Sequence, residues 1–188
     1  LVLPEGVTEL DKGKPIGCSS RRRQLQLKKL YPDFEIQAVR GNVQTRLRKL
    51  QEGQYCALVL AAAGLKRLGL EDRISRYFTV EEILPAAGQA ILAVQARAGT
   101  DVSPLAGFTD PDSTCCALAE RAFVRALDGG CTSPVAAYAR VAGDDMEITG
   151  LYVSPDETGL RRGTTCGPKA QAEALGRSLA LELKGECL

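Results

Sequence analysis

The first 70 residues alternate between strand signals and helix signals, and this alternation constrains the fold more than any other feature. Pro15 and Ile16 lead into Gly17, residues 34–39 alternate apolar and polar side chains, and residues 57–61 form a short apolar run. These three patterns are typical of strands. Helical patterns lie between or after them, and strands that alternate with helices form right-handed β-α-β crossovers. We therefore predict an α/β domain with a mostly parallel sheet. The three helical segments are residues 21–30, 42–50 and 64–68.

Residues from about 105 onward follow a different pattern. A helix that begins at Asp110-Pro111 places Ala119 and Phe123 on one face, and a last helix does the same with Leu179 and Leu183. Three short strand patterns lie between the helices, separated by turn residues. They predict a small α+β domain with a three-stranded antiparallel sheet. The strand patterns are residues 134–141, 146–153 and about 160–165.

Charge and composition exclude several classes of function. The net charge of +1 argues against a nucleic-acid-binding protein, and no apolar run approaches the length of a membrane helix. The chain has no histidine and no C-x-x-C pair, which argues against a zinc site. Seven cysteines without a secretory signal favour reduced thiols, so we expect a cytoplasmic protein. The chain opens on Leu1 without an initiator Met, and we expect it to be part of a longer chain.

Arginines gather where the predicted strands end. In a parallel sheet these positions share the carboxyl edge, where open α/β folds bind ligands. Cations in the first turn of a helix oppose its dipole, and the arginine fork binds carboxylate or phosphate with two parallel bonds. We infer a ligand with several acid groups; the alternative is a solvated basic face paired with the 23 acids of the chain. The candidate residues are Ser20, Arg22, Arg23, Arg40, Arg46, Lys66 and Arg67.

Cys131 follows two glycines in a predicted loop between a helix and a strand. Glycines leave open space around the next side chain, so this thiol is a candidate nucleophile or attachment point. A helix C-cap followed by a small apolar cysteine explains the same residues equally well.

Six segments, taken in order, resemble the porphobilinogen deaminase family. Residues 17–27 resemble the pattern G-T-S-S-L-R-R-x-x-Q-L, and residues 40–50 match R-G-N-V-x-T-R-L-x-K-L without a break. Further matching blocks follow at residues 61–70, 84–89, 119–123 and 129–134. Together they span nearly the whole chain.

The resemblance implies an activity and a cofactor. In this family four porphobilinogen molecules are joined with loss of ammonia to hydroxymethylbilane, on a dipyrromethane cofactor held by a thioether to the cysteine at position 131. The pyrrole acetates and propionates would be bound by five arginines, and Ser20 and Gln89 match polar positions at the cofactor. The five arginines are Arg22, Arg23, Arg40, Arg46 and Arg67.

The resemblance also implies three domains, of which the first two resemble periplasmic binding proteins. Residues 1–88 would be most of domain two, 89–104 a hinge with a strand returning to domain one, and 105–188 a C-terminal domain carrying the cofactor cysteine. The complete enzyme is expected to be monomeric, with porphobilinogen and the growing polypyrrole as its ligands and no nucleic-acid or membrane partner.

Several positions depart from the family pattern. Cys18 replaces a threonine, Arg21 a leucine, Cys56 a common aspartate, and Ala90 and Gln95 replace the glycine and glutamate of G-Q-G-x-x-x-x-E. The H-S-x-K-D-x-P segment with the catalytic aspartate lies upstream of the residues present here. We therefore expect the 188 residues alone to be inactive, with apolar surface uncovered at residues 57–61 and 91–94. The alternatives are a non-catalytic homologue that binds anionic tetrapyrroles, or a nucleic-acid-binding module.

Overall fold

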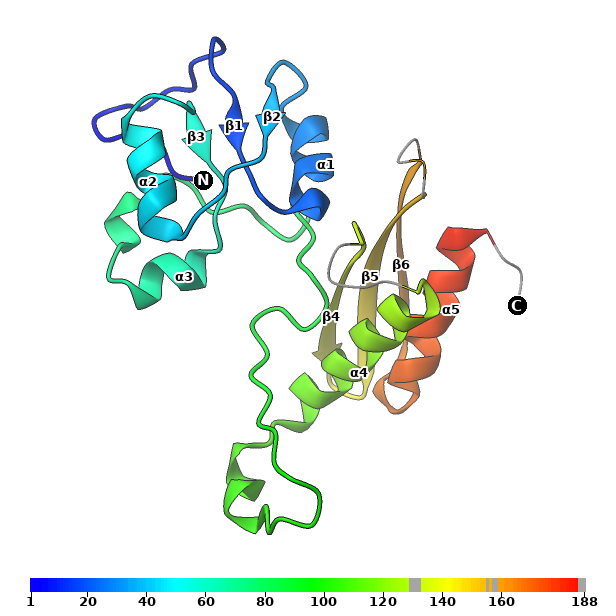
Figure 1. Cartoon of the computed structure of the whole chain (residues 1–188). Coiled ribbons are helices and arrows are strands. Elements are labelled where there is room, and N and C mark those ends of the chain that lie inside the picture. Colours follow the sequence, from blue (N-terminus) through cyan, green and yellow to red (C-terminus); the bar gives the residue numbers. More distant parts are fainter. Residues whose placement is uncertain (129–132, 155, 157–158, 186–188) are drawn as a thin grey trace. The chain divides into compact units, whose positions relative to one another are not determined.

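The computed structural model describes residues 1–128, 133–154, 156 and 159–185. The chain divides into two compact units, Leu1–Ile83 and Leu84–Leu188, which are described one at a time (Figure 1). Among the described residues, no helix combines the length and the apolar character that crossing a membrane requires.

The first unit is an α/β layer built on a parallel sheet, as predicted. Its three strands have the order β2-β1-β3, and each neighbouring pair is parallel. The predicted helices are present, whereas the strands are only two residues long and therefore shorter than predicted. The elements are β1 (Ile16–Gly17), α1 (Arg21–Leu30), β2 (Ile36–Gln37), α2 (Val43–Gln51), β3 (Ala57–Leu58), α3 (Ala62–Arg67) and a 3-10 helix (Glu71–Arg73).

The helices pack on both faces of this sheet. Ile16 and Ala57 lie in one buried cluster with Leu27 of α1. Leu58 lies in a second cluster with Leu50 of α2. Gly17 allows the central strand to approach its neighbours, because a Cβ atom there would lie 2.5 Å from Cδ2 of Leu58. The sheet core thus fixes the ends of β1 and β2, from which α1 and α2 continue.

The expectation of uncovered apolar surface at residues 57–61 is wrong for residues 57–59, whereas Leu60 is half-buried and Ala61 is exposed. The same expectation is confirmed for residues 91–94. Ala57, Leu58 and Val59 are buried. Residue 2 covers this edge of the sheet, because Val2 and Leu58 exchange two backbone hydrogen bonds of 2.9 Å. In contrast, Leu92 is 85% and Val94 71% exposed.

The second unit contains the predicted antiparallel sheet, with strand order β4-β5-β6. Helices α4 and α5 lie together on one face of it (Figure 1). The elements are a 3-10 helix (Ser103–Phe108), α4 (Pro111–Ala126), β4 (Ala136–Ala142), β5 (Asp145–Val153), β6 (Leu160–Pro168), a 3-10 helix (Lys169–Gln171) and α5 (Ala172–Lys184).

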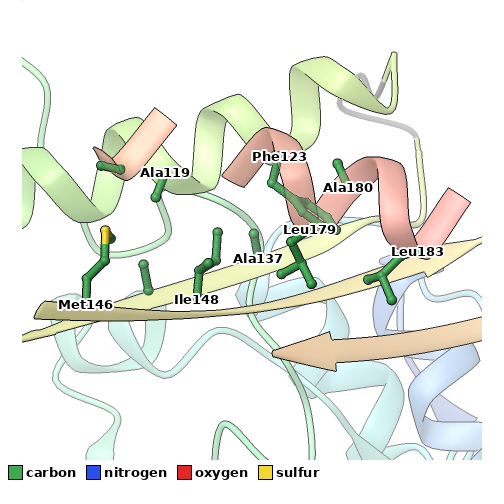
Figure 2. Close-up of a cluster of buried hydrophobic side chains, with 10 residues drawn as sticks. Ala119, Phe123, Ala137, Met146, Ile148, Leu179, Ala180 and Leu183 are labelled. Atoms are coloured by element: carbon green, nitrogen blue, oxygen red, sulfur yellow. The ribbon is translucent and has the colours of Figure 1, made fainter. Parts of the chain in front are cut away.

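The core of the second unit lies between these helices and the sheet. Figure 2 shows Phe123 and Leu179 on the two helices above Ile148 on the sheet, and all three are fully or almost fully buried. The helices touch closely, since a Cβ atom on Gly176 would lie 2.0 Å from the carbonyl oxygen of Ala119. This close packing fixes the position of α4 against α5.

Residues 91–102 form neither helix nor strand in this structure. The returning strand in residues 89–104 and the domain limits at residues 88 and 105 stay predictions. The likeness of the first unit to periplasmic binding proteins also stays a prediction.

Candidate anion-binding site

The parallel sheet brings two loops to one edge. Residues 18–20 connect β1 to α1, and residues 38–42 connect β2 to α2. The backbone N–H of Cys18 donates to Gln37 at 2.9 Å, and the hydroxyl of Ser19 donates to the carbonyl oxygen of Val39. These bonds hold the start of α1 beside Arg40.

Three arginines act on the same buried thiol. Cys18 is fully buried, and this burial raises the pKa of its thiol. The positive charges of Arg23, Arg22 and Arg46 act in the opposite direction and lower the pKa. The positive charges of three arginines on α1 and α2 therefore act on the loop after β1, and their role in binding a ligand stays a prediction.

Arg22 is buried at the start of α1. Burial, followed by the positive charge of Arg23, lowers the pKa of Arg22 to about 10. The first turn of α1 contains no acidic residue, and the side chain of Ser20 makes no capping hydrogen bond. Positive charge and the N–H groups of a helix start are thus concentrated at one place, which is the arrangement that binds anions.

Four of the five candidate arginines form no ion pair with any carboxylate in the described part of the chain. Other arginines of the same unit do form such pairs, at 3.7 Å for Arg48 with Glu52 and 2.7 Å for Arg73 with Glu5. Nε of Arg46 donates to the carbonyl oxygen of Gly41 at 2.7 Å, which orients this side chain without neutralising it. The charge of the group is therefore available to an external anion. The four are Arg23, Arg40, Arg46 and Arg67.

The described contacts do not place the remaining candidate residues beside the loops that follow β1 and β2. Arg67 is the last residue of α3, and five residues of helix carry it about 7.5 Å along the axis from the sheet edge. Gln89 belongs to the second unit, whereas the arginines belong to the first. Cys131 lies outside the described residues.

Gln24 also belongs to this site, although the sequence patterns did not single it out. Its buried side chain donates from Nε2 to the carbonyl oxygen of Cys18 at 2.6 Å and accepts at Oε1 from Nη1 of Arg21 at 3.3 Å. The available signal was helical spacing, because Gln24 lies three residues before Leu27 on the buried face of α1.

In the stretches of chain that the structure describes, no three His, Cys, Asp or Glu side chains are grouped to hold a metal ion.

The chain thus combines an α/β unit, whose arginines follow the strands of a parallel sheet and suit an anionic ligand, with an α+β unit. Comparison with known families identifies its relatives. Residues 1–103 match the family model described as porphobilinogen deaminase, dipyromethane cofactor binding domain. Residues 114–185 match the porphobilinogen deaminase C-terminal domain.

Curated relatives agree with this match. The porphobilinogen deaminase of Alkaliphilus oremlandii is 53% identical over 186 residues, which are 99% of this chain and 62% of the relative. The corresponding protein of Acetivibrio thermocellus is 54% identical over 187 residues, 98% of this chain and 63% of the relative. The Chromobacterium violaceum protein is 43% identical over 179 residues, 94% of this chain and 58% of the relative.

The chain belongs to the porphobilinogen deaminase family, a family of transferases in tetrapyrrole and haem biosynthesis. Its first 103 residues are the domain that binds the dipyrromethane cofactor in this family. The chain spans about three fifths of the length of the curated relatives that it matches.

Proposed function

We propose that the complete protein containing this chain joins four porphobilinogen molecules head to tail into hydroxymethylbilane. Each joining step forms one carbon–carbon bond between pyrroles and releases one ammonia, and a final hydrolysis consumes one water. The observation that supports this proposal is the set of arginines that follow the strands of the parallel sheet, of which Arg23, Arg40 and Arg46 form no ion pair with a carboxylate in the described chain.

The arginines suit the chemistry of the substrate. Each porphobilinogen carries an acetate and a propionate, so a growing polypyrrole gathers many carboxylates. Guanidinium groups bind carboxylates with two parallel hydrogen bonds, and such bonds contribute about 1.5–3 kcal/mol each when charged. Arg22 is buried, and its pKa is lowered to about 10 by burial. A carboxylate bound beside this guanidinium is attracted more strongly than it would be in bulk water, because less solvent separates the two charges.

The residues present also fit the dipyrromethane cofactor, whose pyrroles carry the same acid groups. The positive charges of Arg22, Arg23 and Arg46 near the start of α1, whose first turn holds no acidic residue, are the feature of this structure that such a group requires. We propose that Cys131 holds it by a thioether and that Ser20, Gln89 and the five arginines bind its polar groups. When bound, it supplies the pyrrole to which the first porphobilinogen is joined.

Asp33 and Asp101 are exposed and have surface roles in this structure, which supports placing the catalytic carboxylate outside these 188 residues. Asp33 pairs with Nζ of Lys12 at 2.9 Å. Asp101 accepts a hydrogen bond of 2.9 Å from the backbone N–H of Ser103. We propose that the catalytic aspartate belongs to an N-terminal domain of the complete protein, and that the 188-residue chain alone makes no hydroxymethylbilane.

The same proposal includes the arrangement of the complete protein. Residues 1–88 form most of a binding-protein-like second domain, 89–104 a hinge with a returning strand, and 105–188 the C-terminal domain. We propose that the complete protein is a monomer in the cytoplasm.

The experiment is an assay with porphobilinogen on two purified proteins, the complete protein and residues 1–188. We expect hydroxymethylbilane from the first and none from the second, with intact mass confirming each chain. Retention of tetrapyrrole without turnover in the complete protein would instead identify a non-catalytic homologue. Turnover by residues 1–188 at the rate of the complete protein would place the catalytic carboxylate within this sequence.

A further inference from the structure

The carboxylate of Glu120 binds two backbone N–H groups from separate segments of the second unit. Glu120 lies on α4 and is only 5% exposed. Its Oε2 accepts from the N–H of Gly88 at 2.6 Å, and its Oε1 accepts from the N–H of Ala139 on β4 at 2.8 Å. No cation in the described ranges forms an ion pair with it. One side chain thus ties residue 88 to both α4 and β4.

Gly88 is the centre of two overlapping turns. The N–H of Gln89 donates to Ala86 at 3.0 Å, and the N–H of Ile91 donates to Gly88 at 3.1 Å. The third residue of each turn has a positive φ, +70° at Gly88 and +74° at Ala90, as in type II turns. Gln89 therefore lies between two left-handed residues, and its direction depends on how this double turn is held.

Packing alone does not explain a carboxylate at position 120. Its neighbours Ala119 and Phe123 are apolar and fully buried, and burial raises the pKa of Glu120. An apolar residue would fill this position without desolvating a charge. The feature that calls for an acceptor with two oxygens is the pair of N–H groups from Gly88 and Ala139.

We propose that Glu120 is a positioning residue for Gln89. By holding the N–H of Gly88, it sets the double turn and so the direction in which the Gln89 amide meets the cofactor. This inference rests on the cofactor-binding role proposed above for Gln89.

The hydrogen bond between the Gly88 N–H and the Glu120 carboxylate is tested first, in the 188-residue chain, because this test needs no substrate. Glu120→Leu removes both acceptor oxygens and keeps a side chain of similar length. We expect the Gly88 amide to exchange with solvent at least about tenfold faster, measured residue by residue by NMR, because a bond to a charged acceptor is lost. The exposed Glu182→Leu on α5 is the matched control and should leave Gly88 unchanged. Unchanged exchange at Gly88 in Glu120→Leu would overturn the inference. If that variant does not fold, Glu120→Gln replaces it, with faster exchange expected at Gly88.

The functional step is tested in the complete protein by a double-mutant cycle. We expect Glu120→Gln to lower turnover of porphobilinogen about tenfold in the parent and less than about twofold in the Gln89→Ala background, because the two residues act through one contact. An equal loss in both backgrounds would show a merely structural role and overturn the inference. An inactive parent protein would refute the proposed function instead, while exchange at Gly88 still decides whether Glu120 holds the turn.

Discussion

The side-chain amide of Gln24 donates a hydrogen bond of 2.6 Å to the carbonyl oxygen of Cys18. Both groups are buried, and the bond joins the first turn of α1 to the end of the central strand. Because Ser20 provides no side-chain cap, Gln24 does much to hold the start of α1, which carries Arg22 and Arg23.

Gln24→Leu should therefore destabilise the first unit. The change leaves a buried carbonyl oxygen without its donor, and we expect the free energy of unfolding to fall by about 1–3 kcal/mol. Urea denaturation followed by circular dichroism measures this. The exposed Gln44→Leu on α2 should change the same free energy by no more than about 0.5 kcal/mol. Equal losses in the two variants would contradict a special role for Gln24.

Arg40→Lys should slow the joining of porphobilinogen units, although the positive charge at this position is kept. Lysine lacks the fork that binds a carboxylate with two parallel bonds, so we expect kcat/KM for porphobilinogen in the complete protein to fall about tenfold. The matched control is Arg48→Lys on α2, which pairs with Glu52 at 3.7 Å and lies outside the candidate group. If both variants keep parental turnover and cofactor content, carboxylate binding by Arg40 is refuted.

Glu120 should make the stability of the second unit depend on pH. Its pKa in the folded protein is raised above the ordinary 4.5, mainly by burial, so the folded state keeps a proton that the unfolded state releases. The contribution of Glu120 to stability is therefore fully present below pH 4.5 and is lost as the pH rises through the folded pKa.

Comparison with Glu120→Gln isolates this effect. The free energy of unfolding of the parent minus that of the variant should decrease as the pH is raised from 4.5 to neutrality. Glu182→Gln controls for the loss of one exposed carboxylate. A difference between parent and Glu120→Gln that stays constant over this range would be inconsistent with a raised pKa.

Ala90→Gly should stabilise the second unit. Ala90 has φ +74° in the third position of a turn, where the family pattern has glycine. Glycine relieves the strain of the left-handed conformation, but it also makes the unfolded chain more flexible. We expect the net result to be a rise of about 0.5–1 kcal/mol in the free energy of unfolding. Ala86→Gly, where φ is not positive, should instead lose about 0.5–1 kcal/mol. Thermal denaturation of both variants measures these changes in stability. A lower stability of Ala90→Gly than of the parent would contradict strain at this residue.

Local patterns and chain topology were sufficient to predict much of this fold. Residues 21–30 were predicted as a helix and form one with the same bounds, because Tyr31-Pro32 stops the helical pattern. The shared carboxyl edge of parallel strands is the reason to expect Arg22, Arg23 and Arg46 near one another, and the charges of all three act on the Cys18 thiol.

The missed features depend on contacts between distant segments. The pairing of Val2 with Leu58 covers a sheet edge that the sequence leaves open. Glu120 and Gln24 bind backbone groups of other segments. Such partners cannot be predicted from the pattern of side chains, because every residue type has the same backbone groups. Helical spacing does place Glu120 between Cys116 and Phe123 on the packed face of α4, which was a signal of burial.

The most direct test of the account is the site of covalent attachment in the complete protein. Intact mass followed by peptide mapping should find dipyrromethane on the peptide that contains Cys131, and Cys131→Ser should abolish both the adduct and turnover. An adduct on Cys18 or Cys56, or an active Cys131→Ser protein, would contradict the account.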